Sequence, residues 1–256
     1  MQLTRRDALS ATAIAGLAAG MAHAEPVKSS KAKSDTTESM PGHVVLLGDS
    51  IFDNKSYVKP GPPVIDQLRK ALPAGWKATL LARDGSVAGQ VYLQLERLPA
   101  DATHLIVSTG GNDALQQQDI LEKRVATVSD ALAALSTLRE KFATTYARML
   151  EALLAAKRPA MVCTIYDPNF KDLQQQRVCV SALTLYNDCI HRAAALRHFP
   201  LLDLRQIFRA PADYANPIEP SVIGGQKLAT HITRIVQHHD FNSNNAVMFG
   251  APSATQ

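Results

Sequence analysis

A serine that could act as a nucleophile follows a short apolar run. The stretch "VVLLGDS" (44–50) places Gly48-Asp49-Ser50 at the end of a predicted buried strand. Acyl transfer needs such a hydroxyl, a base within hydrogen-bond reach, and donors directed at the developing oxyanion. By itself, a Gly-Asp-Ser turn is more simply a helix start, because Asp and Ser cap helices well. The interpretation of Ser50 therefore depends on what the other strand ends carry.

Two more polar turns follow predicted strands. Asp84-Gly85 comes after "KATLLA" (77–82), and Gly110-Gly111-Asn112-Asp113 ends the strand that begins at residue 104. Taken singly, Gly85 is a turn residue and Asn112 a helix cap. In a parallel sheet, however, functional groups collect beyond the carboxyl ends of the strands. These turns are therefore expected to lie beside Ser50.

Together and in this order, "GDSIFDN" (48–54) and "STGGNDAL" (108–115) resemble two sequence blocks of the SGNH (GDSL) hydrolase family. The resemblance covers about residues 43–237. It implies a three-layer α/β/α fold of the flavodoxin-like type with a five-stranded parallel sheet, and acyl hydrolysis through a serine acyl-enzyme. It also implies that Ser50 is the nucleophile. The oxyanion hole would consist of the backbone N–H groups of Ser50 and Gly85 and the side-chain amide of Asn112.

The fourth block departs from the family pattern of an Asp, two spacers and a His. In "YANPIEPSVIGGQKLA" (214–229), Asn216 stands at the Asp position and Glu219 at the His position. Glu219 could be the base if partial burial raises its pKa, which is about 4.3 in the unperturbed side chain. Alternatively, it accepts backbone N–H bonds at the start of the last helix. Asn216 either orients Glu219 or forms a turn before Pro217.

No histidine of the predicted domain is well placed to act as the base for Ser50. The remaining histidines of the predicted domain are expected at the far ends of strands or along helices, away from Ser50: His43, His104, His191, His198, His231, His238 and His239. Asp203 and Asp213 are further candidates by topology, without a motif behind them. Asp53 and Asn54 either shape the nucleophile turn or cap a helix.

The elements that would position these residues alternate along the chain. Nearly continuous apolar runs predict five strands covered on both faces, at 43–48, 77–82, 104–110, 160–166 and 199–204. Helical periodicity predicts helices at about 128–156, 181–196 and 226–237. The first helix carries a stripe from Leu132 through Leu135, Leu138 and Phe142 to Leu153, which is expected to be core. Alternating strands and helices predict a parallel sheet between helix layers.

The N-terminal segment has the features of an export signal. Arg5-Arg6, an Ala/Gly/Leu stretch and Ala22-His23-Ala24 predict a twin-arginine-like signal peptide over 1–24. Residues 25–42 are low in apolar residues and predict a flexible linker. The hydrolase-like domain is expected at 43–239 and a flexible tail at 240–256. The mature protein is therefore expected in the periplasm or outside the cell.

Composition narrows the function classes. The chain is 46% hydrophobic with a formal net charge of +4, and no basic stripe suggests nucleic-acid binding. Neither GxGxxG nor GxxxxGK[ST] follows a strand, and no Cys/His cluster suggests a metal, so no cofactor is expected. Three cysteines leave at least one unpaired, and a Cys179–Cys189 disulfide requires Cys179 to lie in a loop that folds back. A monomer is expected.

The sequence thus predicts an exported serine esterase or acyl hydrolase with Ser50, Gly85, Asn112 and Glu219 at its site. Its substrate would be a small-molecule, glycan or lipid acyl ester. Loss of the Asp and the His leaves two alternatives open. One is a catalytically impaired domain that binds a carbohydrate or a partner protein, and the other is an acyltransferase that excludes water from the acyl-enzyme.

Overall fold

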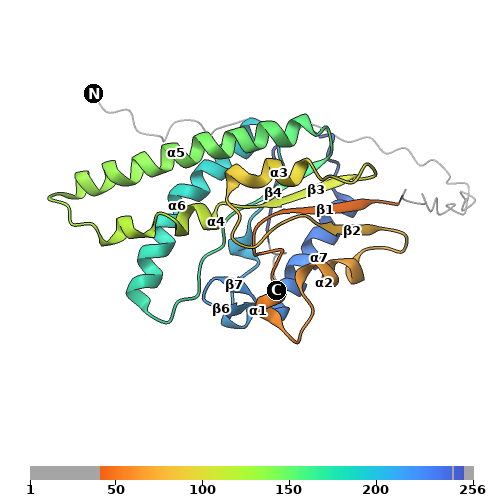
Figure 1. Cartoon of the computed structure of the whole chain (residues 1–256), viewed down its shortest axis with the longest axis horizontal. Coiled ribbons are helices and arrows are strands. Elements are labelled where there is room, and N and C mark those ends of the chain that lie inside the picture. The colour runs from red at the N-terminus through yellow and green to blue at the C-terminus, as the bar shows by residue number, and fades with distance from the viewer. Residues whose placement is uncertain (1–40, 244, 251–256) are drawn as a thin grey trace, which may run out of the picture. The chain divides into compact units, whose positions relative to one another are not determined.

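A parallel sheet forms the centre of the computed structural model, which describes residues 41–243 and 245–250 (Figure 1). Its strands lie in the order β2-β1-β3-β4-β5-β8, and every neighbouring pair is parallel. The strands are β1 (His43–Gly48), β2 (Lys77–Leu80), β3 (His104–Ser108), β4 (Ala160–Cys163), β5 (Leu201–Leu202) and β8 (Met248–Phe249). The predicted α/β fold with a parallel sheet between helices is confirmed.

The sheet has six strands where the sequence predicts five. The additional strand, β8, lies within 240–256, the segment predicted to be a tail. Leu201 N donates to Val247 O at 2.9 Å and Asp203 N donates to Phe249 O at 2.8 Å. The sequence gives little sign of this strand because it is two residues long and its Met248 side chain is exposed.

Alternate residues of the strands pack against two helix layers. Val44 and Leu46 of β1 share a buried cluster with α2 (Val64–Ala71) and α7 (Val222–His238). Val45 and Leu47 point to the opposite face. That face is covered by α3 (Val91–Leu95), α5 (Val128–Ala155) and α6 (Leu173–Leu196). Burial on both faces explains the continuous apolar character of the strand sequences.

The long helix α5 is core only in its second half. Its buried residues begin at Phe142 and end at Leu153. The first half extends beyond the sheet (Figure 1), where Leu132 is 60% exposed and Leu135 and Leu138 line a pocket. The prediction that the whole stripe from Leu132 is core is therefore wrong, because no strand lies beneath the first turns.

Two helices begin earlier than predicted because polar residues cap them. The side chain of Asp172 accepts a hydrogen bond from Gln175 N at 2.7 Å, and α6 starts at Leu173. Ser221 caps α7 in the same way. Because Cys179 and Cys189 both lie on α6, they are not bridged, and all three cysteines are free.

The remaining elements are short. The helices are α1 (Lys55–Val58) and α4 (Gly111–Leu115), with 3₁₀ turns η1 (Ala88–Gln90), η2 (Gln118–Glu122), η3 (Leu204–Gln206) and η4 (Pro211–Asp213). An antiparallel pair, β6 (Tyr214–Asn216) and β7 (Glu219–Pro220), precedes α7. Within 41–243 and 245–250, no helix combines the length and apolar character needed to cross a membrane. The predicted signal 1–24 and residues 25–40 of the predicted linker lie outside the described residues.

Candidate active site

The turn that carries Ser50 is fixed by close backbone packing. Gly48 has φ of +122°, and a Cβ atom there would lie 1.7 Å from the carbonyl oxygen of Ser108. The side-chain amide of Gln94 makes two hydrogen bonds to the same glycine. Gly48 N donates to Gln94 Oε1 at 2.7 Å, and Gln94 Nε2 donates to Gly48 O at 2.8 Å. Only glycine fits this position, so the end of β1 is held at a set distance from β3.

The backbone N–H of Ser50 is available to a ligand. Asp49 N on one side donates to Ser108 O at 3.2 Å, and Ile51 N on the other donates to Asp49 Oδ1 at 3.3 Å. Within the described part of the chain, Ser50 N donates to no protein acceptor. An unpaired N–H beside a serine hydroxyl can stabilise an oxyanion formed on that hydroxyl's target carbonyl.

The second and third strand ends meet beside this turn. Asn112 Nδ2 donates to the carbonyl of Ser86 at 2.9 Å, which leaves the second amide hydrogen without a partner among the described residues. Gly85, the neighbour of Ser86, has φ of +80°, and its N–H likewise meets no acceptor in the described chain. Each of these groups thus has an N–H that makes no hydrogen bond within the described chain, as an oxyanion hole requires.

Glu219 is buried and lines the same pocket as Ser50. It is 4% exposed, and its Oε2 has no hydrogen-bond partner in the part of the chain that the structure describes. The last helix is capped instead by Ser221, whose Oγ accepts from Ile223 N at 3.1 Å and Gly224 N at 3.2 Å. The alternative role of Glu219 as a helix cap is therefore wrong.

Burial perturbs two carboxyl groups beside Ser50. Burial raises the pKa of Glu219 to about 7; the nearby Ser50 hydroxyl acts against this shift, and Asp84 adds to it. Burial also raises the pKa of Asp49 to about 8, opposed by the Ile51 N–H and reinforced by the charge of Glu219. Both carboxyl groups therefore keep a proton to higher pH than a carboxyl group in water does.

Asn54 joins the Ser50 turn to the strand that carries Glu219. Its Nδ2 donates to the carbonyl of Pro220 at 3.3 Å, and its Oδ1 accepts from Val64 N at 2.9 Å. The Asn54 side chain is therefore a direct link between the first and fourth sequence blocks. The sequence alone assigns Asn54 only to turn shaping or capping, because nothing in it indicates that Pro220 lies nearby.

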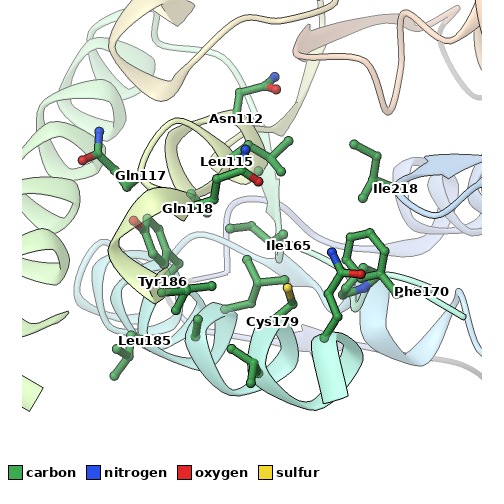
Figure 2. Close-up of a pocket in the computed structure, with 18 of the residues that line it drawn as sticks. Asn112, Leu115, Gln117, Gln118, Ile165, Phe170, Cys179, Leu185, Tyr186 and Ile218 are labelled. Atoms are coloured by element: carbon green, nitrogen blue, oxygen red, sulfur yellow. The ribbon is translucent and has the colours of Figure 1, made fainter. Parts of the chain in front are cut away.

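Ser50, Asn112 and Glu219 line one pocket of about 690 Å³, together with Asp49. Figure 2 shows Asn112 at one end of this pocket and Leu185 at the other, with Ile165 and Cys179 between them. The volume is in the usual range for small-molecule sites. Gly85 does not line the pocket and reaches it only through its neighbour Ser86, which accepts the Asn112 amide.

The other candidate carboxylates have structural partners. Asp203 pairs with Arg205 at 2.8 Å, and Asp213 pairs with Lys227 at 2.6 Å. The Asn216 side chain accepts from Ile218 N at 3.0 Å and so forms a turn. No histidine of the described residues lines the pocket. Nor do His, Cys, Asp or Glu side chains there form a group that could hold a metal ion.

Comparisons with known proteins identify a family and similar folds. Residues 46–224 match the model of the GDSL-like lipase/acylhydrolase family. An extracellular lipase from Streptomyces rimosus superposes with a TM-score of 0.54 at 19% identity, covering 75% of this chain and 98% of its own.

Two further solved structures are similar in fold. For an acetyl xylan esterase, AlAXEase, the TM-score is 0.56 at 18% identity, with 76% of this chain and 99% of that chain covered. For phospholipase A1 from Streptomyces albidoflavus NA297, the TM-score is 0.51 at 19% identity, with 78% and 100% covered. No curated protein matches the sequence.

Proposed function

The chain belongs to the GDSL-like lipase/acylhydrolase family, and on that premise we propose that it hydrolyses carboxylic esters through an acyl-enzyme on Ser50. Family membership supports acyl hydrolysis in general. The particular mechanism rests on one observation: Glu219, a buried carboxyl with an unpaired oxygen, occupies the pocket with Ser50. A base whose pKa lies near the working pH combines the right protonation state with adequate proton affinity.

In the proposed reaction, Ser50 Oγ attacks the ester carbonyl carbon as the Glu219 carboxylate takes the hydroxyl proton. The carbonyl oxygen becomes an oxyanion, which accepts hydrogen bonds from the Ser50 N–H and the Asn112 amide, the two predicted donors whose residues line the pocket. The C–O bond to the alcohol then breaks, and the alcohol leaves with the proton from Glu219. Water repeats the sequence, attacking the acyl-enzyme and releasing the acid and free Ser50.

The test is hydrolysis of p-nitrophenyl butyrate by the full chain from pH 5 to 9. Because the ionised form of Glu219 is the base, kcat/KM should rise with pH through a single ionisation near 7. Ser50→Ala and Glu219→Gln should each reduce kcat by on the order of 10³ or more. Glu96→Gln, an exposed carboxyl outside this pocket, is the matched control and should leave the profile unchanged.

Two results would overturn parts of this proposal. If the wild type is no faster than Ser50→Ala, the domain does not hydrolyse simple esters and its role as a binding domain takes precedence. If Glu219→Gln keeps wild-type activity while Ser50→Ala does not, another group is the base. Acyl transfer would be revealed by adding an alcohol acceptor and finding transesterified product in place of free acid.

Export is also part of the proposal, supported by the sequence of 1–24. The Streptomyces rimosus neighbour is described as an extracellular lipase, which is compatible with it. Expression of the full chain in a bacterium with twin-arginine transport should release a protein whose N-terminus is Glu25. Arg5→Lys with Arg6→Lys should keep the chain in the cytoplasm at its full length. Unprocessed wild-type protein in the cytoplasm would contradict export.

A further inference from the structure

The pocket holds the candidate catalytic residues at one end and has a mostly apolar wall, with polar side chains among the apolar ones, along the rest of its length. Ser50, Asp49, Asn112 and Glu219 form its polar end. Beyond Ile165, three segments of the chain contribute apolar side chains to the wall: Leu115, Ile120 and Leu121 from α4 and η2, Leu135 and Leu138 from α5, and Val178, Ala182, Leu183 and Leu185 from α6. The first and third segments also contribute polar side chains: Gln117, Gln118, Asp119 and Glu122 around η2, and Asp172, Gln174 and Gln175 at the start of α6. A cavity of this composition favours a ligand that is polar only at one end.

The apolar part is built from helix turns that have no strand beneath them. Leu135 and Leu138 precede Phe142, the first buried residue of α5. Val178 and Ala182 likewise precede Tyr186, the first buried residue of α6. Only the second halves of both helices pack on the sheet, so the first halves are free to enclose a ligand. Figure 2 shows Cys179 on α6 across this space from Leu115 and Gln118.

The part of the pocket beyond Ile165, between the first halves of α5 and α6, forms a groove. We propose that this groove holds a straight acyl chain of medium length whose carbonyl is at Ser50; the proposal rests on the ester hydrolysis proposed above. The position of the base indicates which half of the ester occupies the groove. Asp84 and Tyr57 lie near Glu219, because the charge of Asp84 raises the pKa of Glu219 and the charge of Glu219 raises that of Tyr57. The leaving alcohol takes its proton from Glu219, so we assign the alcohol to this side. Asp84 and Tyr57 are both exposed, and the Tyr57 hydroxyl donates to Asp84 Oδ2 at 2.8 Å. That open, polar side suits an alcohol, and the enclosed apolar side suits the acyl chain.

The first measurement compares kcat/KM for p-nitrophenyl esters from acetate to decanoate. Each methylene that leaves water should increase kcat/KM by about fourfold until the groove is full. The acyl assignment is tested with methyl decanoate against decyl acetate, which place the same chain on opposite sides of the carbonyl. Methyl decanoate should be hydrolysed at least tenfold faster, and a preference for decyl acetate would overturn the acyl assignment.

A variant that fills the groove identifies its location. Ala182→Phe adds a ring in the middle of the α6 wall and should lower the ratio of decanoate to acetate kcat/KM by at least tenfold. The control, Ser181→Phe, adds the same ring one residue away, where Ser181 is exposed and its Oγ donates to Arg177 O of its own helix. The control should keep the wild-type ratio. If both variants have the same ratio of decanoate to acetate kcat/KM, the acyl chain does not bind beside Ala182.

A binding measurement separates the groove from the chemistry. Cys179 lines the groove and is partly exposed, whereas Cys163 and Cys189 are buried. In full-length Ser50→Ala, saturating methyl decanoate should slow the reaction of Cys179 with a thiol reagent at least fivefold. Methyl acetate should leave that rate unchanged, and Cys179→Ser should abolish the labelling that is measured.

The outcomes distinguish the two proposals. Protection of Cys179 without hydrolysis of any ester would keep the chain-binding groove and overturn the proposed catalysis. Hydrolysis that is independent of chain length, with no protection of Cys179, would keep the esterase and overturn the acyl groove.

Discussion

Glu219 is the residue on which the chemistry of this site depends. A carboxyl group in water is a weak base for a serine hydroxyl, and burial is the means by which this protein changes that. Burial also raises the pKa of Asp49, close by, to about 8. Two buried carboxyl groups thus lie near Ser50, and Glu219 is the one with the lower pKa and with a side-chain hydrogen bond to Ser50.

The buried Asp49 should make stability depend on pH. Its folded-state pKa of about 8 lies above its ordinary value of 3.8, so its contribution is full below pH 3.8 and is lost as pH rises through 8. Relative to Asp49→Asn, the wild type should lose several kcal/mol of unfolding free energy between pH 4 and 9. Urea unfolding of both proteins across this range measures the difference. Parallel curves would mean that Asp49 is ionised when folded.

Gln94 should matter to both stability and rate, although it touches no substrate. Gln94→Ala leaves the buried N–H of Gly48 without a partner, whereas the Gly48 carbonyl keeps its hydrogen bond from Arg83 N, so the change should cost about 1–3 kcal/mol of unfolding free energy. Loosening the Ser50 turn should also lower kcat more than it raises KM. Gln226→Ala, at an exposed site on α7, is the control for both measurements. A fall in stability with unchanged kcat would show that the turn is held by other contacts.

At the level of elements, the sequence predicts strands better than helix starts. The strands carrying Ser50 and Asn112 are continuous apolar runs, so their ends and the polar turns beyond them can be read directly. Half of the residues in the first turns of α6, "LQQQRVCV", are polar, and these turns line a pocket instead of packing on the sheet. The hydrophobic periodicity of a helix sequence reflects burial against the rest of the protein, so it is weak where the helix lines a pocket.

The two halves of the fold should respond differently to loss of a helix cap. Ser221 caps α7, whose face is core, so Ser221→Ala should lower the global unfolding free energy by about 1 kcal/mol. Thr127 caps α5 at its projecting end, where Thr127 Oγ1 accepts from Asp130 N at 3.1 Å. Thr127→Ala should fray the first turns and increase amide exchange there, with little change in the urea midpoint. Equal midpoint shifts would contradict the division of α5 into two parts.

At the scale of the whole molecule, the sequence predicts which residues lie together at the carboxyl ends of the strands. Ser50 and Asn112 could be predicted to meet because parallel strands end together. The approach of Glu219 to Ser50 depends on the Asn54 to Pro220 contact, which spans 166 residues and leaves no local pattern. The sixth strand was missed for a related reason, since β8 exists only by pairing with β5.

Removal of β8 should therefore affect association as well as stability. A chain ending at residue 243 would leave the backbone groups of Leu201 and Asp203 without their partners and expose the edge of β5. We expect a lower urea midpoint and concentration-dependent self-association in sedimentation velocity, because open strand edges pair with one another. A chain ending at residue 250 keeps β8 and should behave as the wild type. An unchanged urea midpoint and an unchanged sedimentation profile in the chain ending at residue 243 would contradict a structural role for β8.

The location of the groove also bears on how readily this protein could acquire new preferences. The nucleophile turn is fixed by Gly48 and Gln94 inside the core, where almost any change would disturb folding. The first halves of α5 and α6 contribute little to that core, so Leu135, Leu138 or Ala182 can change without cost to the sheet. Mutation can therefore explore ligand shape while the reaction chemistry stays constant, and a library confined to these turns is the natural starting point for directed evolution.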